Sequence, residues 1–102
     1  MIKLLLSWDT LPDHEQEHFE FLIREFAPKL AALGIRPIEA WFTLYGREND
    51  NPLITVEAIA DDLDKLRQVL ATDEWQSLKE NLLQYVTNFQ QKVIRGRPTL
   101  QI

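Results

Sequence analysis

Residues 14–18, HEQEH, are the segment whose residue types and spacing point most directly to chemistry. They fit H-E-x-x-H, in which a helix presents two histidines to zinc and the glutamate acts as general base. The apolar spacing of the following residues, however, places His14 and His18 on the flank of that helix or in water. No third histidine follows, and the chain has no cysteine. We therefore interpret HEQEH as the polar first turn of an ordinary helix, and we predict no metal site and no cofactor.

The same residues suit proton transfer better than metal binding. An imidazole titrates near neutral pH, so His18 is a candidate acid or base. Glu15 lies one helical turn earlier and projects along the apolar stripe, so we expect it to point into the mouth of a cleft. His18 and Glu15 are thus the catalytic candidates. The alternative is a solvated edge with two surface histidines.

Length and composition limit the classes of protein to consider. The 102 residues predict one domain, 1–102, with a single hydrophobic core. The net charge of -5 argues against nucleic acid, because an acidic domain repels phosphate. The apolar start MIKLLLSWD is too short for a signal peptide or a membrane span. We expect a soluble cytoplasmic protein without a membrane partner.

Hydrophobic periodicity predicts the elements that position these residues. Strands are expected over residues 2–8, 36–46, 51–60 and 85–95. A first helix begins at Asp13 as N-cap, with Gln16 completing a capping box, and ends at Gly34. Pro28 should kink or divide it. Its expected apolar stripe is Phe19, Leu22, Ile23, Phe26, Leu30 and Leu33. Asp61 and Thr72 are expected to cap two further helices.

This order predicts an α+β fold, the ferredoxin-like β-α-β-β-α-β plait. Its antiparallel four-stranded sheet would carry all helices on one face. The other face would expose Trp41, Thr43 and Tyr45, and a monomer rarely leaves so large an apolar patch uncovered. We predict a homodimer through this sheet face. On the same face, Glu39 and Glu57 would need water or a partner such as Arg36 or Lys3.

The plait also predicts where a functional site would lie. The end of the first strand, the start of the first helix, the end of the second strand and the start of the last strand meet at one rim. Residues from these segments are the ligand-binding candidates, namely Trp8, His14, Tyr45, Tyr85 and Asn88. Aromatic side chains at such a rim would suit a planar ligand, although they more often fill a core.

The whole pattern resembles the dimeric α/β-barrel superfamily. LRQVLATDEWQSL, residues 66–78, is similar to the broken second helix of NIPSNAP-type and antibiotic-biosynthesis-monooxygenase-like members, and Trp41…Tyr45-Gly46 is similar to their strand end. The resemblance implies a dimer with one cleft per subunit between helices and sheet. Its members include cofactor-free oxygenases, haem degraders, isomerases and cyclases. The haem degraders carry a histidine on the later helix, and this chain has none after His18.

Three functional hypotheses follow. The first is a metal-free small-molecule enzyme, oxygenase- or isomerase-like, on an apolar or aromatic substrate. The second is a non-catalytic small-molecule-binding or stress-response module. The third is an interaction domain whose clefts are filled by side chains. A cavity that contains His18 and Glu15 favours the first, a cavity without ionisable groups favours the second, and a cleft plugged by Trp8 and Phe19 favours the third.

Overall fold

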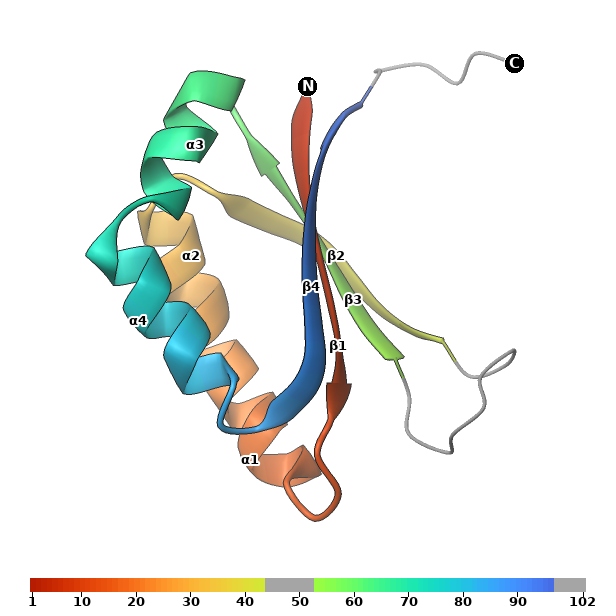
Figure 1. Cartoon of the computed structure of the whole chain (residues 1–102). Helices are drawn as coiled ribbons and strands as arrows, with labels where there is room; N and C mark the ends of the chain where they lie inside the picture. The colour runs from red at the N-terminus through yellow and green to blue at the C-terminus, as the bar shows by residue number, and fades with distance from the viewer. Residues whose placement is uncertain (44–52, 97–102) are drawn as a thin grey trace.

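The computed structural model describes residues 1–43 and 53–96, without the side chains of residues 42, 43 and 53. Its elements follow the predicted order (Figure 1). They are β1 (Ile2–Thr10), α1 (Glu15–Phe21), the π-helix η1 (Leu22–Phe26), α2 (Ala27–Ala32), β2 (Arg36–Thr43), β3 (Leu53–Ala60), α3 (Leu63–Leu70), α4 (Asp73–Leu82) and β4 (Val86–Arg95). The hairpin segment, Tyr45 and the tail after Gly96 lie outside the described residues.

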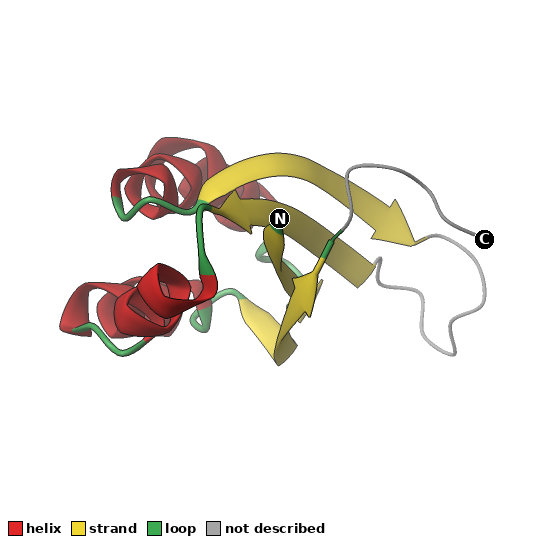
Figure 2. Cartoon of the chain, turned by 90° about the horizontal axis from the view of Figure 1, so that it is seen from above, coloured by secondary structure: helices red, strands yellow, loops and turns green. Residues whose placement is uncertain are grey.

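The four strands form one antiparallel sheet in the order β2-β3-β1-β4. Its register places Leu4 opposite both Ala58 and Val93. Even-numbered residues of β1 and β3 therefore share one face, which the helices cover (Figure 2). The predicted α+β ferredoxin-like plait is confirmed.

The core lies between this face and the helices. Leu4, Leu6 and Trp8 of β1 are fully buried, as period-2 alternation requires for one covered face. From the helices, Leu66 of α3 and Trp75, Leu78 and Leu82 of α4 pack against them. Burial of each such large apolar side chain contributes roughly 1.5–3 kcal/mol.

The first helical segment is continuous but not uniform. Its middle turn, η1, is a π-helix directly before α2, and Pro28 occupies the first turn of α2. Proline clashes with the carbonyl four residues earlier, here that of Arg24, and a wider π turn relieves that clash. Pro28 was predicted to kink or divide the helix; the segment instead changes from π to α geometry beside it without a break. Gly34 ends it with φ of 92° and donates its N–H to the Ala31 carbonyl at 2.9 Å, as predicted.

Two of the three predicted helix caps are wrong by one residue. Asp13 has φ of 67° and belongs to the preceding turn, so His14 is the N-cap of α1 and no side-chain capping bond forms. Asp62, not Asp61, caps α3, because its extended backbone lets the carboxylate accept the Lys65 N–H at 2.7 Å. Thr72 caps α4 as predicted, accepting the Trp75 N–H at 3.2 Å.

The second face of the sheet, called the open face below, is covered by no helix of the described part. Its register-matched residues include Lys3, Leu5, Ser7, Arg36, Glu39, Trp41, Thr55, Glu57, Ile59, Gln90, Lys92 and Ile94. The predicted partner for Glu57 is confirmed, since Lys3 Nζ lies 2.6 Å from its carboxylate. Within the described residues, no helix is long and apolar enough to cross a membrane.

Candidate functional site: a buried Trp–His pair beside an apolar groove

The predicted rim exists, and a buried polar pair lies at its centre. The indole Nε1–H of Trp8, near the end of β1, donates to Nε2 of His18 in α1 at 2.8 Å. The start of β4 joins them through the Tyr85 carbonyl, which accepts the Leu11 N–H, and through Asn88. The prediction that these three segments meet is confirmed. Tyr45, the candidate from the fourth segment, is not among the described residues.

The expected position of His18 was wrong. Its exposed fraction is 0%, although the helical wheel placed it on a flank or in water. The buried residues of this segment are His18, Phe21, Phe26 and Leu30, and the step from Phe21 to Phe26 spans five residues across η1. A wheel of constant angle assumes 3.6 residues per turn. Extrapolated backwards across the π turn, such a wheel predicts that Phe19 is buried at the position that His18 occupies in the structure.

Burial determines the charge of this histidine. Loss of hydration lowers the pKa of His18 from 6.5 to about 4. The ring is therefore neutral at pH 7, and because Nε2 accepts the indole hydrogen, its own hydrogen lies on Nδ1. Nδ1 is buried and has no hydrogen-bond partner among the described residues. An unsatisfied buried donor costs about 1–3 kcal/mol, so it calls for an explanation.

A β-bulge aims Trp8 at His18. The β1–β4 register shifts between Ser7 and Asp9, so Asn88 and Phe89 of β4 both lie opposite Trp8. Asn88 takes the left-handed backbone position of the bulge, with φ of 56°, which asparagine tolerates better than most residues. Its amide donates to the buried Asp9 carboxylate at 2.9 Å. Bulges next to functional sites commonly redirect a side chain in this way.

Aromatic rings enclose the pair. Phe89 is stacked on Trp8 with centroids 6.2 Å apart, and Phe26 meets the Trp8 ring edge-on at 6.0 Å. Phe21 lies 5.5 Å from Tyr85, which is half-buried. The contacts of Phe89 and Phe26 fix the indole, and the rings of Trp8 and Phe19 lie against His18, whose burial lowers its pKa.

The remaining candidates lie away from the pair. His14 is exposed, and its Nδ1 lies 2.8 Å from the Glu17 carboxylate. Glu15 is also exposed, in the first turn of α1. The two histidines thus face different partners, and no group of three His, Cys, Asp or Glu in the described part of the chain could hold a metal ion.

A groove of about 490 Å³ runs between the first helical segment and the edge strand β2. We call it the β2 groove. Its described lining is apolar except for Glu39, and comprises Phe19, Leu22, Ile23, Phe26, Ala27, Pro37, Ile38, Glu39, Ala40, Trp41, Ile54 and Val56. Four of the seven exposed large hydrophobic residues of the described chain are in this lining, with Ile23 exposed by 73%. Such clustering marks a binding surface more often than scattered exposure does.

Two aromatic residues connect the groove with the buried pair. Phe26 lines the groove and contacts the Trp8 ring. Phe19 also lines it, and its ring lies 5.1 Å from that of His18. Neither His18 nor Glu15 is in the lining, so this groove is not the cavity that would favour the enzyme hypothesis. His18 contacts the groove wall through the Phe19 ring.

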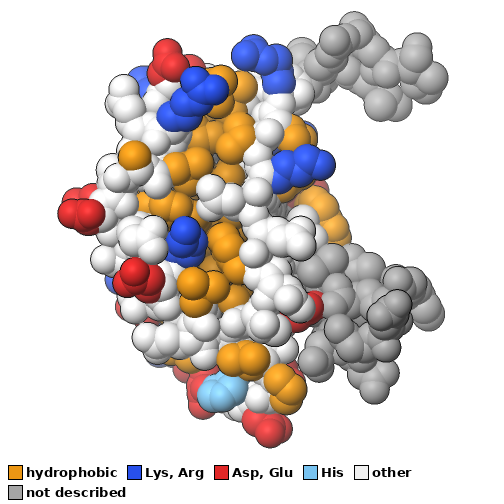
Figure 3. All heavy atoms as spheres, viewed as in Figure 1, with side chains coloured by type: hydrophobic (Ala, Val, Ile, Leu, Met, Phe, Trp, Pro, Cys, Tyr) orange, Lys and Arg blue, Asp and Glu red, His pale blue; other side chains and the backbone are white. Residues whose placement is uncertain are grey.

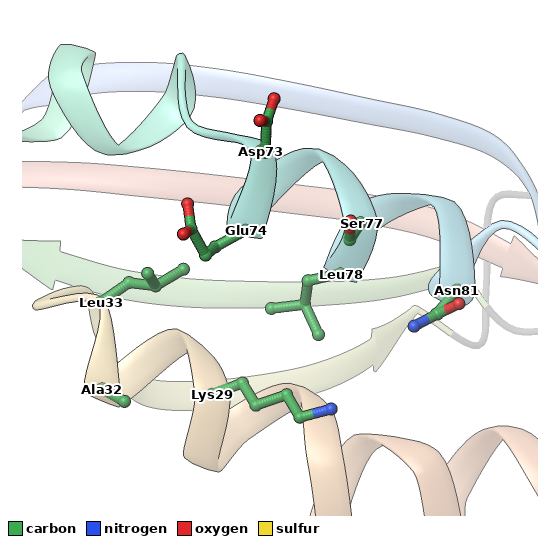
Figure 4. Close-up of a pocket in the computed structure, with 8 residues that line it drawn as sticks. All are labelled: Lys29, Ala32, Leu33, Asp73, Glu74, Ser77, Leu78 and Asn81. Carbon is green, nitrogen blue, oxygen red and sulfur yellow. The ribbon is translucent and has the colours of Figure 1, made fainter.

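A second groove, of about 510 Å³, separates α2 from α4 on the outer side of the helices (Figure 4). Leu33 and Leu78 point into it, and Lys29 and Glu74 stand on opposite walls (Figure 4). Lys29 already contacts Glu25 at 3.3 Å. Apolar side chains also gather between the helices and β4 (Figure 3). Neither place combines a buried polar atom with an apolar wall.

Comparison with solved structures shows which known proteins share this fold. No family model matches the sequence, and no curated protein matches it. Among solved structures, an uncharacterised NIPSNAP domain protein from Burkholderia xenovorans has a TM-score of 0.71 at 12% identity, with 100% of both chains covered. SnoaB, a cofactor-independent oxygenase from Streptomyces nogalater, has 0.67 at 19% identity, covering 97% of this chain and 95% of that one.

A putative antibiotic biosynthesis monooxygenase from Deinococcus radiodurans has a TM-score of 0.68 at 12% identity, over 100% of this chain and 98% of that one. This chain has their fold. The resemblance to NIPSNAP-type and monooxygenase-like proteins is confirmed at that level. At such identities, function has to be argued from the site itself.

Sequence reasoning missed the groove and several residues around the pair. Ile23 was expected in the buried stripe and is exposed, whereas Phe21 was not expected there and is buried. The five-residue spacing from Phe21 to Phe26, just before Pro28, was the available signal. Ile38 gave none, because its exposure depends on β2 being an edge strand.

Proposed function

We propose that the protein binds an apolar or aromatic small molecule in the β2 groove. The observation that carries this is the groove itself, with its volume of about 490 Å³ and its nearly uniform apolar lining. Pockets for small ligands typically measure about 300–1,000 Å³ and are lined by hydrophobic and aromatic side chains. The chain's acidity disfavours anionic ligands, and Glu39 is the charged residue of the lining.

A pair of matched surface variants tests this site. Ile23→Glu places a charge in the groove, and Leu83→Glu places one at an exposed apolar residue outside the lining. With 2-ethylnaphthalene as probe in equilibrium dialysis, we expect Ile23→Glu to weaken binding at least tenfold, about 1.4 kcal/mol. Leu83→Glu should leave the dissociation constant unchanged. Equal effects of the two variants, or no saturable binding by the wild type, would refute the proposal.

A metal-free enzyme of the oxygenase or isomerase kind is the second candidate. The Trp8–His18 pair beside the groove favours it, since a buried polar group at an apolar site is typical of catalysis. SnoaB, described as a cofactor-independent oxygenase, shares the fold. In this candidate function His18 contacts the substrate. Trp8 and Asn88 hold His18 in place, and Glu15 exchanges protons with solvent. Tyr85 and His14 remain predicted ligand contacts, although neither is in the groove's described lining.

Two assays separate catalysis from binding alone. Deuterium incorporation next to the carbonyl of a bound ketone, followed by NMR, reports isomerase-type proton transfer, and an oxygen electrode reports oxygenase activity. The wild type should exceed His18→Asn in at least one assay. Binding without either activity would leave a non-catalytic binding or stress-response module.

We also propose a homodimer through the open face. Leu5, Ile59 and Ile94 are only partly buried there, and Trp41 is exposed. A second copy packed on this face would bury them, and stable interfaces cover about 800 Å² per partner. A cytoplasmic location likewise stays a prediction.

A further inference from the structure

The hydrogen-bonding direction of His18 is set by its neighbour. An indole nitrogen can only donate, so Nε2 of His18, 2.8 Å from Trp8 Nε1, must accept. The neutral ring then has one arrangement available, with its hydrogen on Nδ1. Nδ1 lies buried and has no partner among the described residues.

The indole cannot easily turn to release this arrangement. Phe89 is stacked on one face of Trp8, with an interplanar angle of 12°, and Phe26 abuts its edge. The bulge behind it is fastened by the Asn88–Asp9 hydrogen bond. A side chain fixed by packing and by such a bond keeps its polar atom in one direction, which is how a site is preorganised.

We propose that Trp8 is a positioning residue that holds His18 as a hydrogen-bond donor, and that the groove's ligand is an apolar or aromatic molecule with an uncharged carbonyl oxygen. This inference rests on the proposed function of the β2 groove. Nδ1–H requires an acceptor, and the apolar walls require the rest of the ligand to be hydrophobic. Ketones and quinones meet both conditions.

Phe19 contacts both the β2 groove and the His18 ring that carries the Nδ1–H donor. Its ring lies 5.1 Å from that of His18, and it forms part of the groove wall. Phe19 is 38% exposed, so part of its ring already faces solvent. In this proposal the Phe19 ring turns aside and the ligand carbonyl reaches Nδ1 from the groove.

The first test reads the tautomer directly. In ¹⁵N NMR of the imidazole at pH 7, wild-type His18 should show a protonated Nδ1 and an unprotonated Nε2. Trp8→Phe keeps an aromatic ring but removes the donor, so part of the signal should move to the Nε2–H tautomer. A wild-type ring with its hydrogen on Nε2, or a spectrum unchanged by Trp8→Phe, would overturn the role of Trp8.

The second test measures the ligand preference. The probes are 2-acetylnaphthalene and 2-ethylnaphthalene, which have similar shapes and differ in the carbonyl. The ratio of their dissociation constants is compared between variants, so differences in water solubility cancel. Replacing His18 by Leu should shift the ratio about fivefold against the ketone, the effect of one hydrogen bond of ordinary strength. His18→Asn, whose amide also donates from near Nδ1, should retain the wild-type ratio.

The outcomes separate this inference from the function on which it rests. If both probes bind, Ile23→Glu weakens both, and the ratio is the same in wild type and His18→Leu, the groove function stands and the carbonyl inference fails. If neither probe binds the wild type, both fail. If His18→Leu does not fold, Trp8→Phe should still shift the ratio at least twofold, and an unchanged ratio would refute the inference.

Discussion

Acid should unfold this protein in a way that depends on one buried imidazole. The pKa of His18 falls from 6.5 in the unfolded chain to about 4 in the folded one, because burial penalises the charged ring. The unfolded state therefore binds the proton more readily between these values. The stability associated with neutral His18 is present above pH 6.5 and decreases as the pH falls toward 4.

The magnitude follows from linkage. Each unit of pKa difference corresponds to about 1.4 kcal/mol, so the difference of two and a half units corresponds to roughly 3 kcal/mol in full. Between pH 7 and pH 4.5, about 2.5 kcal/mol of this should be lost. Protonation places a second hydrogen on Nε2, where it meets the Trp8 donor at 2.8 Å. A loss of about 2.5 kcal/mol is a large fraction of the free energy of unfolding of a typical domain, about 5–15 kcal/mol.

Urea unfolding at pH 7, 5.5 and 4.5 measures this effect, with His18→Asn as reference. Both proteins carry the same carboxylates, so the difference between their curves isolates the histidine. The wild type should lose about 2.5 kcal/mol more than the variant over this range. Parallel curves, or an NMR titration midpoint of His18 above pH 6, would refute the reasoning.

Three further outcomes are expected. His18→Ala should lower the free energy of unfolding, measured in urea, by about 2–3 kcal/mol. The exposed His14→Ala should lower it by less than about 0.5 kcal/mol. Similar values for the two variants would show that burial of the Trp8–His18 pair is unimportant. Asn88→Gly should destabilise less than Asn88→Ala, because only alanine adds strain at φ of 56°, and the reverse order in thermal melts would count against the bulge. Light scattering should give twice the 12.0 kDa chain mass, and Trp41→Glu should yield monomers; a monomeric wild type would contradict the open-face dimer.

Local signals predicted much of the fold. Thr72 caps α4 through a bond to a neighbour three residues away, and Gly34 ends α2 with the positive φ that glycine permits. Such features depend on a few adjacent residues, so the sequence displays them. The Asp61 cap failed for the complementary reason, since Asp61 and Asp62 are both candidates and only the backbone path decides between them. The Asp13 cap failed because its φ of 67° places Asp13 in the turn before α1.

The candidate site was predictable only in part. Topology correctly brought Trp8, His18 and Asn88 to one rim, because strand ends and helix starts meet there in any plait. The burial of His18 was not predictable from a uniform wheel, because one π turn rotates everything before it. The β2 groove depends on how an edge strand lies against a helix, which no local pattern encodes.

The π turn also has a consequence for chain length. From Phe21 to Phe26 the helix spends five residues where a regular α-helix would need four to return to the same buried face. This segment therefore contains one residue beyond what its core contacts require. Deleting one residue from 22–25, together with Pro28→Ala to remove the clash, should yield an unbroken α-helix with the same inner face. In α4, which is regular throughout, the same deletion would turn Leu82 away from the sheet.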